Sequence, residues 1–312
     1  MIDWPSYNRS LVRRGEILFS YDFLDGWDCE LDRMNEGKIG KPFTFPDSFI
    51  LAIGYIRYSF RLPYRQTEGI IKATGKRLPE KPPSYGHICK RINKLNIDIQ
   101  RKKTGDYNED YIIVSIDSTG IKITNRGQWM DKKWKIQNRK GYLKIHVAVD
   151  VKTKEILALD VTDEKVHDGE VLKKLVNQVL DCSTNTTNTT TTRGLSKMVI
   201  KIKSALGDGA YDSNANFQYL QEKGITPGIK IRTNSVVSLE NNRLRNKEVM
   251  QQTKGDLLKW KKKRKYGHRW MAETAFSTLK RTFGEYVSAT KFDNMVKEMI
   301  IKVSLYNLFR RL

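Results

Sequence analysis

Cysteine is scarce in this chain of 312 residues, which contains only three, at the widely separated positions Cys29, Cys89 and Cys182. An odd number with no C-x-x-C spacing predicts neither a disulfide framework nor a structural zinc site. Long apolar runs are also absent: the longest, Phe49 to Ile56, is far shorter than the ~20 residues that cross a bilayer. We therefore expect a protein without membrane spans.

The first residues have neither the basic lead nor the apolar core of a secretory signal, so we expect a cytoplasmic protein. Hydrophobic residues make up 39% and charged residues 29%, a mixture typical of a globular chain of one or two domains. Positive charge is in excess, with 57 Lys and Arg against 35 Asp and Glu, a net charge of +22. Such a charge attracts polyanions and favours nucleic acid as the partner, although a lysine-rich codon bias can produce it too.

The basic residues are densest between Lys254 and Arg281, where aromatic side chains are interleaved with them. Cations that contact phosphates beside aromatic faces that stack on bases are typical of nucleic-acid grooves. The residues predicted to contact DNA here are Lys261, Lys262, Lys263, Arg264 and Trp260.

Residues 1–105 have the pattern of an all-helical region, with helical segments at 46–60, 64–74 and 85–95. Three short helices fit a helix-turn-helix unit, whose third helix would contact DNA through Lys90, Arg91 and Lys94. A plain helical subdomain with a solvated basic face fits the same pattern equally well. Residues 99–110 are expected to form a linker.

Residues 106–312 have an α/β pattern, because strand and helix signals alternate along them. The order of these signals predicts a mixed sheet flanked by helices. A polar tract at 183–192 has nothing to bury and is expected to be a flexible loop. The predicted strands lie at 111–116, 143–150, 156–161, 199–206 and 228–232, and helices are expected to begin at Asp168 and near Asp212.

Two of the predicted strands end in an aspartate, Asp117 after Ile116 and Asp208 after Gly207. Carboxylates at adjacent strand ends can share Mg²⁺ or Mn²⁺ ions, which assist phosphodiester cleavage. Each aspartate alone is also compatible with an ordinary turn cap. The glycines on both sides of Asp208 argue against capping there, and Asp212 is the better cap for the helix that follows.

A third carboxylate follows from helical periodicity in the segment after Lys265. Tyr266, Arg269, Glu273 and Lys280 fall within a stripe roughly 60° wide on one side of a helix. An ordinary amphipathic helix with an Arg269–Glu273 pair fits this segment alone. An apolar face about 100° away, expected to dock the helix on the sheet, consists of Ala272, Ala275, Phe276, Leu279 and Phe283.

Together these segments resemble the DDE transposases of prokaryotic insertion sequences, in particular the IS4/IS5-like group. The motifs Val-Ser-Ile-Asp117-Ser-Thr-Gly and Leu-Gly-Asp208-Gly-Ala-Tyr-Asp resemble the first two catalytic motifs of that family. The likeness covers about residues 111–312, and the helical N-terminal region is similar to IS5-type elements. The family signature Y-x2-R-x3-E-x6-K is matched by Tyr266, Arg269, Glu273 and Lys280.

The resemblance implies an RNase H-like catalytic domain over residues 106–312, in which Asp117, Asp208 and Glu273 bind two Mg²⁺ or Mn²⁺ ions. Water and then a DNA 3′-hydroxyl would attack a phosphodiester. Arg269 and Lys280 would grip phosphate oxygens, and Tyr266 would hydrogen-bond a phosphate or stack beneath a base. Residues 233–265 would form a basic insertion near the DNA end.

The resemblance also implies double-stranded DNA as the partner, both the terminal inverted repeats and the target, bound by a homodimer that is associated with the nucleoid. Two alternatives remain open from the sequence. One is an RNase H-like metal-dependent nuclease without strand transfer. The other is a DNA-binding protein that descends from a transposase and is no longer catalytic.

Overall fold

The computed structural model of the chain describes residues 3–74, 78–99, 111–123, 141–181 and 201–312. The chain forms two compact units. One contains Met1–Asp98, Thr282–Gly284 and Ala289–Leu312, and the other contains Ile99–Arg281 and Glu285–Ser288. Residues 289–312, predicted to belong to the catalytic domain, thus group with the N-terminal helices. The predicted boundary at 105/106 and the polar tract 183–192 lie outside the described residues.

The N-terminal unit is helical, and the three helices predicted from the sequence are present. A buried cluster dominated by aromatic and isoleucine side chains holds it together, including Trp27, Phe49, Ile53 and Ile92. The C-terminal helix contributes Ile301 to the same cluster. The helices are α1 (Trp4–Leu18), η1 (Asp22–Leu24), α2 (Trp27–Asn35), α3 (Asp47–Ser59), α4 (Tyr64–Thr74), α5 (Tyr85–Lys94) and α12 (Phe292–Arg310).

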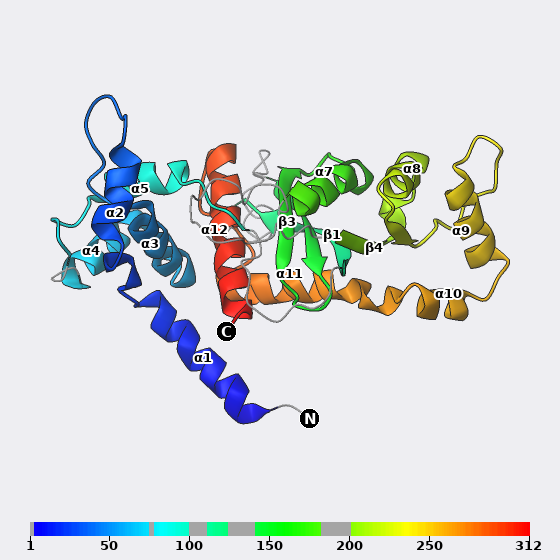
Figure 1. Cartoon of the computed structure of the whole chain (residues 1–312), viewed down its shortest axis with the longest axis horizontal. Helices are drawn as coiled ribbons and strands as arrows, with labels where there is room; N and C mark the ends of the chain where they lie inside the picture. Colours follow the sequence, from blue (N-terminus) through cyan, green and yellow to red (C-terminus); the bar gives the residue numbers. More distant parts are fainter. Residues whose placement is uncertain (1–2, 75–77, 100–110, 124–140, 182–200) are drawn as a thin grey trace, which may run out of the picture. The chain divides into compact units, whose positions relative to one another are not determined.

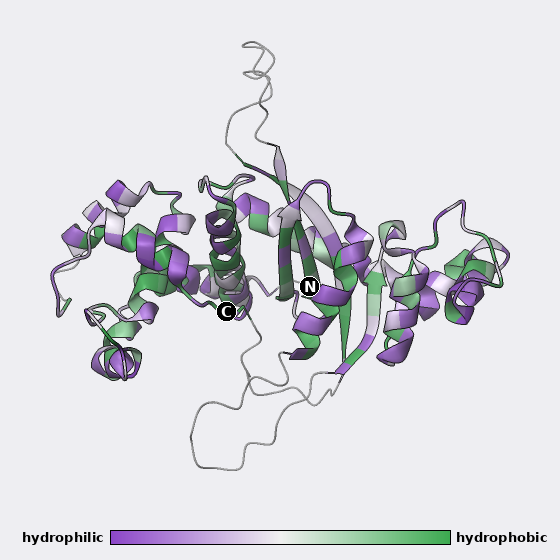
Figure 2. Ribbon diagram, turned by 90° about the horizontal axis from the view of Figure 1, so that it is seen from above, coloured by the Kyte–Doolittle hydropathy of each residue, from purple (hydrophilic) through white to green (hydrophobic). Residues whose placement is uncertain are grey.

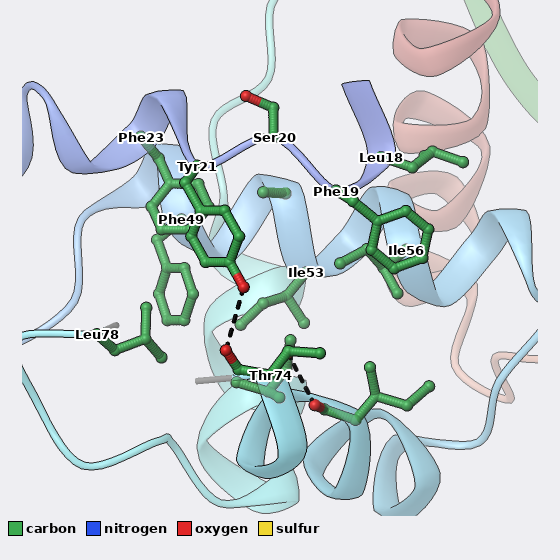
Figure 3. Close-up of a pocket in the computed structure, with 13 residues that line it drawn as sticks. Leu18, Phe19, Ser20, Tyr21, Phe23, Phe49, Ile53, Ile56, Thr74 and Leu78 are labelled. Atoms are coloured by element: carbon green, nitrogen blue, oxygen red, sulfur yellow. Dashed lines mark hydrogen bonds between the residues drawn. The ribbon is translucent and has the colours of Figure 1, made fainter. Parts of the chain in front are cut away.

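A small apolar pocket lies within this unit, between the segment after α1 and helices α3 and α4 (Figure 3). Phe19, Phe49 and Ile53 are among its lining residues. The Tyr21 hydroxyl donates a hydrogen bond to the Thr74 carbonyl oxygen, 3.1 Å away, and so ties the segment after α1 to the end of α4. None of the helices in the described residues is long and apolar enough to span a bilayer.

Helix α5, the candidate recognition helix, carries three basic residues, of which two are exposed to solvent. Lys90 and Lys94 are exposed, whereas Arg91 is 8% exposed. Its Nη2 atom donates to Asp47 Oδ1 at 2.7 Å and to the Phe45 carbonyl oxygen at 2.9 Å. The DNA contact of Arg91 stays a prediction, and in this structure its guanidinium is bound inside the unit.

The second unit is built on a five-stranded mixed sheet, as the sequence pattern predicted, and the strand order is β3-β2-β1-β4-β5. β1 pairs antiparallel with β2, which pairs antiparallel with β3, while β4 and β5 continue the sheet in parallel. This architecture is consistent with an RNase H-like domain. The strands are β1 (Tyr111–Lys122), β2 (Tyr142–Asp150), β3 (Ile156–Asp163), β4 (Lys201–Gly207) and β5 (Thr226–Ile229).

Helices cover both faces of the sheet (Figure 1). On one face, α7 (Asp168–Asp181) and α8 (Asn214–Glu222) bury apolar side chains such as Leu172 and Phe217 against Ile116 and Ala148 of the strands. The other face meets the turn η4 (Tyr266–Arg269) and α11 (Trp270–Phe283). The strands between these layers are among the most hydrophobic segments of the chain (Figure 2).

Strand β1 is longer than its apolar run predicted. It does not end at Ile116 but continues through Asp117 to Lys122, because β2 pairs with it as far as Lys122↔Tyr142. The last paired residues of β1 and β4 are Ser115 and Leu206. Asp117 therefore lies within β1, beyond the last residue that pairs with β4 but still paired with β2.

The position of β5 and the cap of α8 differ from the sequence-based predictions. The strand itself lies at Thr226–Ile229, two residues before the predicted start. Helix α8 is capped by Ser213, whose side chain accepts a hydrogen bond from the Asn216 amide, and not by Asp212. Asp212 is instead buried in an ion pair with Arg245, with 2.7 Å between Oδ1 and Nε.

We predict that Arg91→Ala lowers the free energy of unfolding by about 2 kcal/mol, because it leaves two acceptors without their charged donor. Lys90→Ala is the matched control, since it removes the same charge from the adjacent, exposed position and should change stability by less than about 0.5 kcal/mol. Urea denaturation followed by tryptophan fluorescence measures both. Equal stability of the two variants would contradict a structural role for Arg91.

Candidate active site

Asp117 and Asp208 lie at the same level of the sheet. The parallel register pairs Ser115 with Leu206, and each aspartate follows two residues later on its own chain segment. Asp208 leaves β4 immediately after Gly207 and begins a short turn, η3 (Gly209–Tyr211). Its carboxylate accepts a hydrogen bond of 2.9 Å from the Ala210 amide, so Asp208 caps this turn, contrary to the expectation from its flanking glycines. The sheet thus brings together the two aspartates that the sequence singled out.

One face of β1 is in contact with the segment that carries the third carboxylate. Ser115, Asp117 and Thr119 share this face because side chains alternate along a strand. The Ser115 hydroxyl donates to the Arg269 carbonyl oxygen at 2.6 Å. Farther along, Lys280 Nζ donates to Thr119 Oγ1 at 2.8 Å. The segment from Arg269 to Lys280 therefore contacts this face of β1 near both of its ends.

Arg269 lies between two of the candidate carboxylates. Its Nη1 atom is 3.3 Å from Asp117 Oδ2, and its Nη2 atom donates to Glu273 Oε1. The Arg269–Glu273 pair expected of an ordinary helix is therefore present. The additional contact with Asp117 makes Arg269 a link between strand and helix.

Asp117 has an unusual charge environment. Burial raises the pKa of the Asp117 carboxyl to about 6, although the Ser118 amide and the Arg269 charge act in the opposite direction. The negative charges of Asp208 and Glu273 raise that pKa further. Because the charges of Asp208 and Glu273 act on Asp117, the three carboxylates repel one another. A cation bound among them would reduce this repulsion.

The four stripe residues do not share one α-helix as predicted, because Tyr266 and Arg269 precede the helix that carries Glu273 and Lys280. Residues Tyr266–Arg269 form the 3-10 turn η4, and the α-helix begins only at Trp270. The Tyr266 ring packs against Trp260, with 5.1 Å between the ring centroids. Burial raises the pKa of its hydroxyl, so that it stays neutral and can donate a hydrogen bond.

The apolar face predicted for α11 is confirmed, since Ala272, Ala275, Phe276, Leu279 and Phe283 are all buried. Docking of this face leaves the polar stripe at the edge of the core. A hollow of about 430 Å³ opens beside the stripe. It is lined by Asp117, Ser118, Thr119, Glu273, Phe276, Ser277, Lys280, Arg281 and Glu285.

The donor chemistry of the site suits a divalent cation, because Mg²⁺ and Mn²⁺ prefer carboxylate oxygens. Within the described part of the chain, no three His, Cys, Asp or Glu residues are grouped so as to hold one ion as they stand. Asp117 and Asp208 fit as a pair of ligands. Glu273 would join them only after leaving Arg269, whose guanidinium now supplies the positive charge.

The basic insertion that precedes the site contains α9 (Arg243–Thr253) and α10 (Leu257–Lys263). Lys261, Lys262 and Lys263 are exposed there, as a DNA-contacting surface requires. Trp260 is only 3% exposed, and its indole N–H donates to Glu248 Oε2 at 2.5 Å. Arg264 forms an ion pair with the same glutamate.

The DNA contacts of Trp260 and Arg264 stay predictions, and in this structure both side chains are bound to Glu248. Glu248 is fully buried, and a buried carboxylate needs charged and hydrogen-bonding partners. Ser115 and Thr119, which form hydrogen bonds with Arg269 and Lys280, were not among the residues predicted for the site. Their alternation with Asp117 along β1 is the signal that could have identified them.

Comparison with known families agrees with this architecture. Residues 108–308, more than half of the chain, match a family model described as a transposase DDE domain. Residues 12–126 match a second family model with the same description. The fold and the acidic site thus define the class of DDE transposase domains, whose members normally use divalent metal ions. This chain belongs to the DDE transposase family, and its assignment to the IS4/IS5-like group stays a prediction.

We predict that replacing Lys261, Lys262 and Lys263 together with Gln weakens binding to specific and random DNA duplexes alike. The slope of log K against log salt should become shallower by up to ~0.9 for each phosphate contact that is lost. Electrophoretic mobility shifts over a salt series measure this slope.

The matched control replaces three other exposed lysines of the same unit, Lys165, Lys173 and Lys174, which lie on or just before α7 on the opposite face of the sheet. This control should bind DNA more tightly and with a steeper salt dependence than the α10 triple variant. If both triple variants behave identically, α10 is not a DNA-contacting surface.

Proposed function

We propose that this protein is the transposase of an insertion sequence, which binds the element ends and catalyses metal-dependent DNA cleavage and strand transfer. The observation that carries the proposal is the convergence of Asp117 and Asp208 at one level of the sheet, with Glu273 linked to Asp117 through Arg269. Membership in the DDE transposase family supports the same function.

The proposed division of labour follows from the position of each side chain. Asp117 and Asp208 would hold the metal ions, and Glu273 would complete the ligand set. Bound Mg²⁺ or Mn²⁺ would activate the attacking water or 3′-hydroxyl and stabilise the leaving oxygen. The hollow beside Asp117 and Glu273 provides room for the scissile strand.

The cationic members of the stripe would hold the DNA backbone beside the carboxylates. Arg269 presents a planar fork that can bind two phosphate oxygens, whereas Lys280 acts as a point charge at the edge of the hollow. Tyr266 is half-buried and neutral, so it would donate a hydrogen bond to a phosphate. These three residues would orient the strand and leave bond cleavage to the metal site.

DNA binding outside the site would rest on exposed lysines. In the N-terminal helical region, Lys90 and Lys94 of α5 remain available to meet the element ends. In the second unit, Lys261 to Lys263 would contact phosphates along α10. A homodimer on paired terminal repeats, and residence at the nucleoid, are the arrangements that this function would require.

We predict that Asp117→Asn, Asp208→Asn and Glu273→Gln each lower metal-dependent cleavage of a labelled element end by at least about 100-fold, because each removes a metal-binding charge. Mobility shifts should be nearly unchanged for all three. Asp256→Asn is the matched control, since Asp256 is an exposed helix cap on α10 and asparagine caps equally well. A triad variant that cuts normally would remove that residue from the site.

A joining assay with a pre-cut 3′-hydroxyl end separates the proposed function from its alternatives. A transposase should insert this end into target DNA. Cleavage without joining would favour an RNase H-like nuclease, and binding without either reaction would favour a non-catalytic DNA-binding protein.

We also predict that Arg269→Ala and Lys280→Ala slow cleavage and joining much more than they weaken DNA binding, because other cations retain the DNA. Arg269→Lys should restore activity only in part, since one ammonium cannot reproduce the guanidinium fork. Lys173→Ala, on the opposite face of the sheet, serves as the control for charge loss. If Arg269→Ala cleaves DNA at the wild-type rate, Arg269 is only a partner of Glu273 on the helix surface.

A further inference from the structure

The turn that carries Asp208 is held by a side chain from a later part of the chain. Arg232 Nε donates to the Gly209 carbonyl oxygen at 2.8 Å, and its Nη2 atom donates to the Ala210 carbonyl oxygen at 3.2 Å. These are the two residues that follow Asp208. The amide of Ala210 already donates to the Asp208 carboxylate, so one peptide segment is fixed on both sides.

The same turn ends at Asp212, whose carboxylate is completely buried. One of its oxygens, Oδ2, accepts from the Arg232 amide at 3.1 Å and from the Ser235 hydroxyl at 2.6 Å. Arg245 donates to both oxygens, through Nε at 2.7 Å and Nη2 at 3.2 Å. Asp212 is thus a buried anion with a full set of donors, and none of these donors belongs to the turn itself.

Steric contacts restrict the turn from the other side. Tyr211 is 1% exposed, and its ring lies so close to Gly207 that a Cβ atom at residue 207 would be 3.0 Å from Tyr211 Cδ2. The Lys230 amide also donates to the Gly207 carbonyl oxygen at 3.2 Å. The buried Tyr211 ring thus anchors the inner side of the turn, while Arg232 binds carbonyl oxygens on its outer side.

Apart from Asn216 of α8, whose Nδ2 atom donates to the Tyr211 carbonyl oxygen at 3.0 Å, the side-chain donors outside the turn belong to residues 230–245, which connect β5 to the start of α9. We propose that Arg232 and Asp212 are positioning residues for Asp208, and that they make the placement of this carboxylate depend on the basic insertion. The inference rests on the proposed function only in treating Asp208 as a metal ligand. Arg232 acts on the backbone after Asp208, while Asp212 anchors the Arg232 backbone and the first turn of α9.

The chemistry of the two residues explains why substitutes should fail. A lysine at position 232 has a single ammonium and cannot donate along the same two fixed directions as the guanidinium. An asparagine at position 212 would turn an amide N–H group toward Arg245 and leave a buried guanidinium without its counter-charge. Groups that orient metal ligands typically change metal affinity by about 10- to 100-fold when they are lost.

The experiment measures Mn²⁺ binding to the full-length protein without DNA, by electron paramagnetic resonance, together with hydrogen–deuterium exchange of the peptide covering residues 207–213. Arg232→Ala and Asp212→Asn should each weaken Mn²⁺ binding by about 10-fold or more and speed exchange in this peptide. Arg232→Lys should lie between wild type and Arg232→Ala. Asp208→Asn gives the reference for loss of the ligand itself.

Two matched controls remove the same kinds of group at exposed positions within the basic insertion. Arg243→Ala deletes an exposed arginine of α9, and Asp256→Asn makes the isosteric change at the exposed cap of α10. Both should bind Mn²⁺ and exchange like wild type. Because Arg232 is itself exposed, its alanine variant should fold even if Asp212→Asn does not.

Wild-type Mn²⁺ affinity and wild-type exchange in Arg232→Ala would overturn the proposal. A lower melting temperature in Asp212→Asn, with both readouts unchanged, would also overturn it, since that result means a structural role alone. The proposed function fails separately, if a wild-type protein that binds Mn²⁺ neither cuts nor joins DNA. In that case the positioning role would still stand on the two readouts.

Discussion

The parallel pairing of β1 with β4 is the constraint on which the site depends. β1 has two neighbours, but β4 accompanies it only as far as the Ser115–Leu206 pair, whereas β2 continues to the end of the strand. This difference in length leaves Asp117 in regular strand geometry beside an open edge. Asp208 starts its turn at the same level because the register is fixed by hydrogen bonds along both strands. Helices on both faces then bury the strands and keep this register.

The carboxylates of Asp117, Asp208 and Glu273 repel one another, and the surrounding residues must offset this repulsion. Asp117 is partly buried, and its raised pKa reflects desolvation together with the charges of Asp208 and Glu273. Arg269 offsets part of this repulsion through its contacts with Asp117 and Glu273. On the proposed function, a bound cation would supply the same charge, so Arg269 would no longer be required by the carboxylates and its fork would be available to a phosphate.

Local periodicity was sufficient to predict much of the fold and the candidate site. It located the strands, the apolar face of α11 and the order of the three acidic residues. It did not predict that β1 continues past Ile116, because backbone pairing with β2 does not require apolar side chains. It also misplaced Trp260, whose burial depends on Glu248 in another helix, a partner that no local pattern reveals.

Several differences between the sequence-based expectations and the structure arise from the difference between arginine and lysine. Several arginines counted as surface charge satisfy carboxylates or carbonyl oxygens inside the protein, whereas the lysines beside them stay in solvent. A guanidinium is planar and weakly hydrated, so it can be buried against fixed acceptors, while an ammonium is strongly hydrated and favours exposure.

The internal pairs are Arg91–Asp47, Arg245–Asp212 and Arg264–Glu248, and the exposed lysines include Lys90, Lys94, Lys261, Lys262 and Lys263. On the proposed function, attraction for DNA would therefore rest largely on exposed, hydrated lysines, whose phosphate contacts hold a duplex without reading its sequence. Arg269 differs from the other three arginines, because its partners are the acidic residues of the site itself.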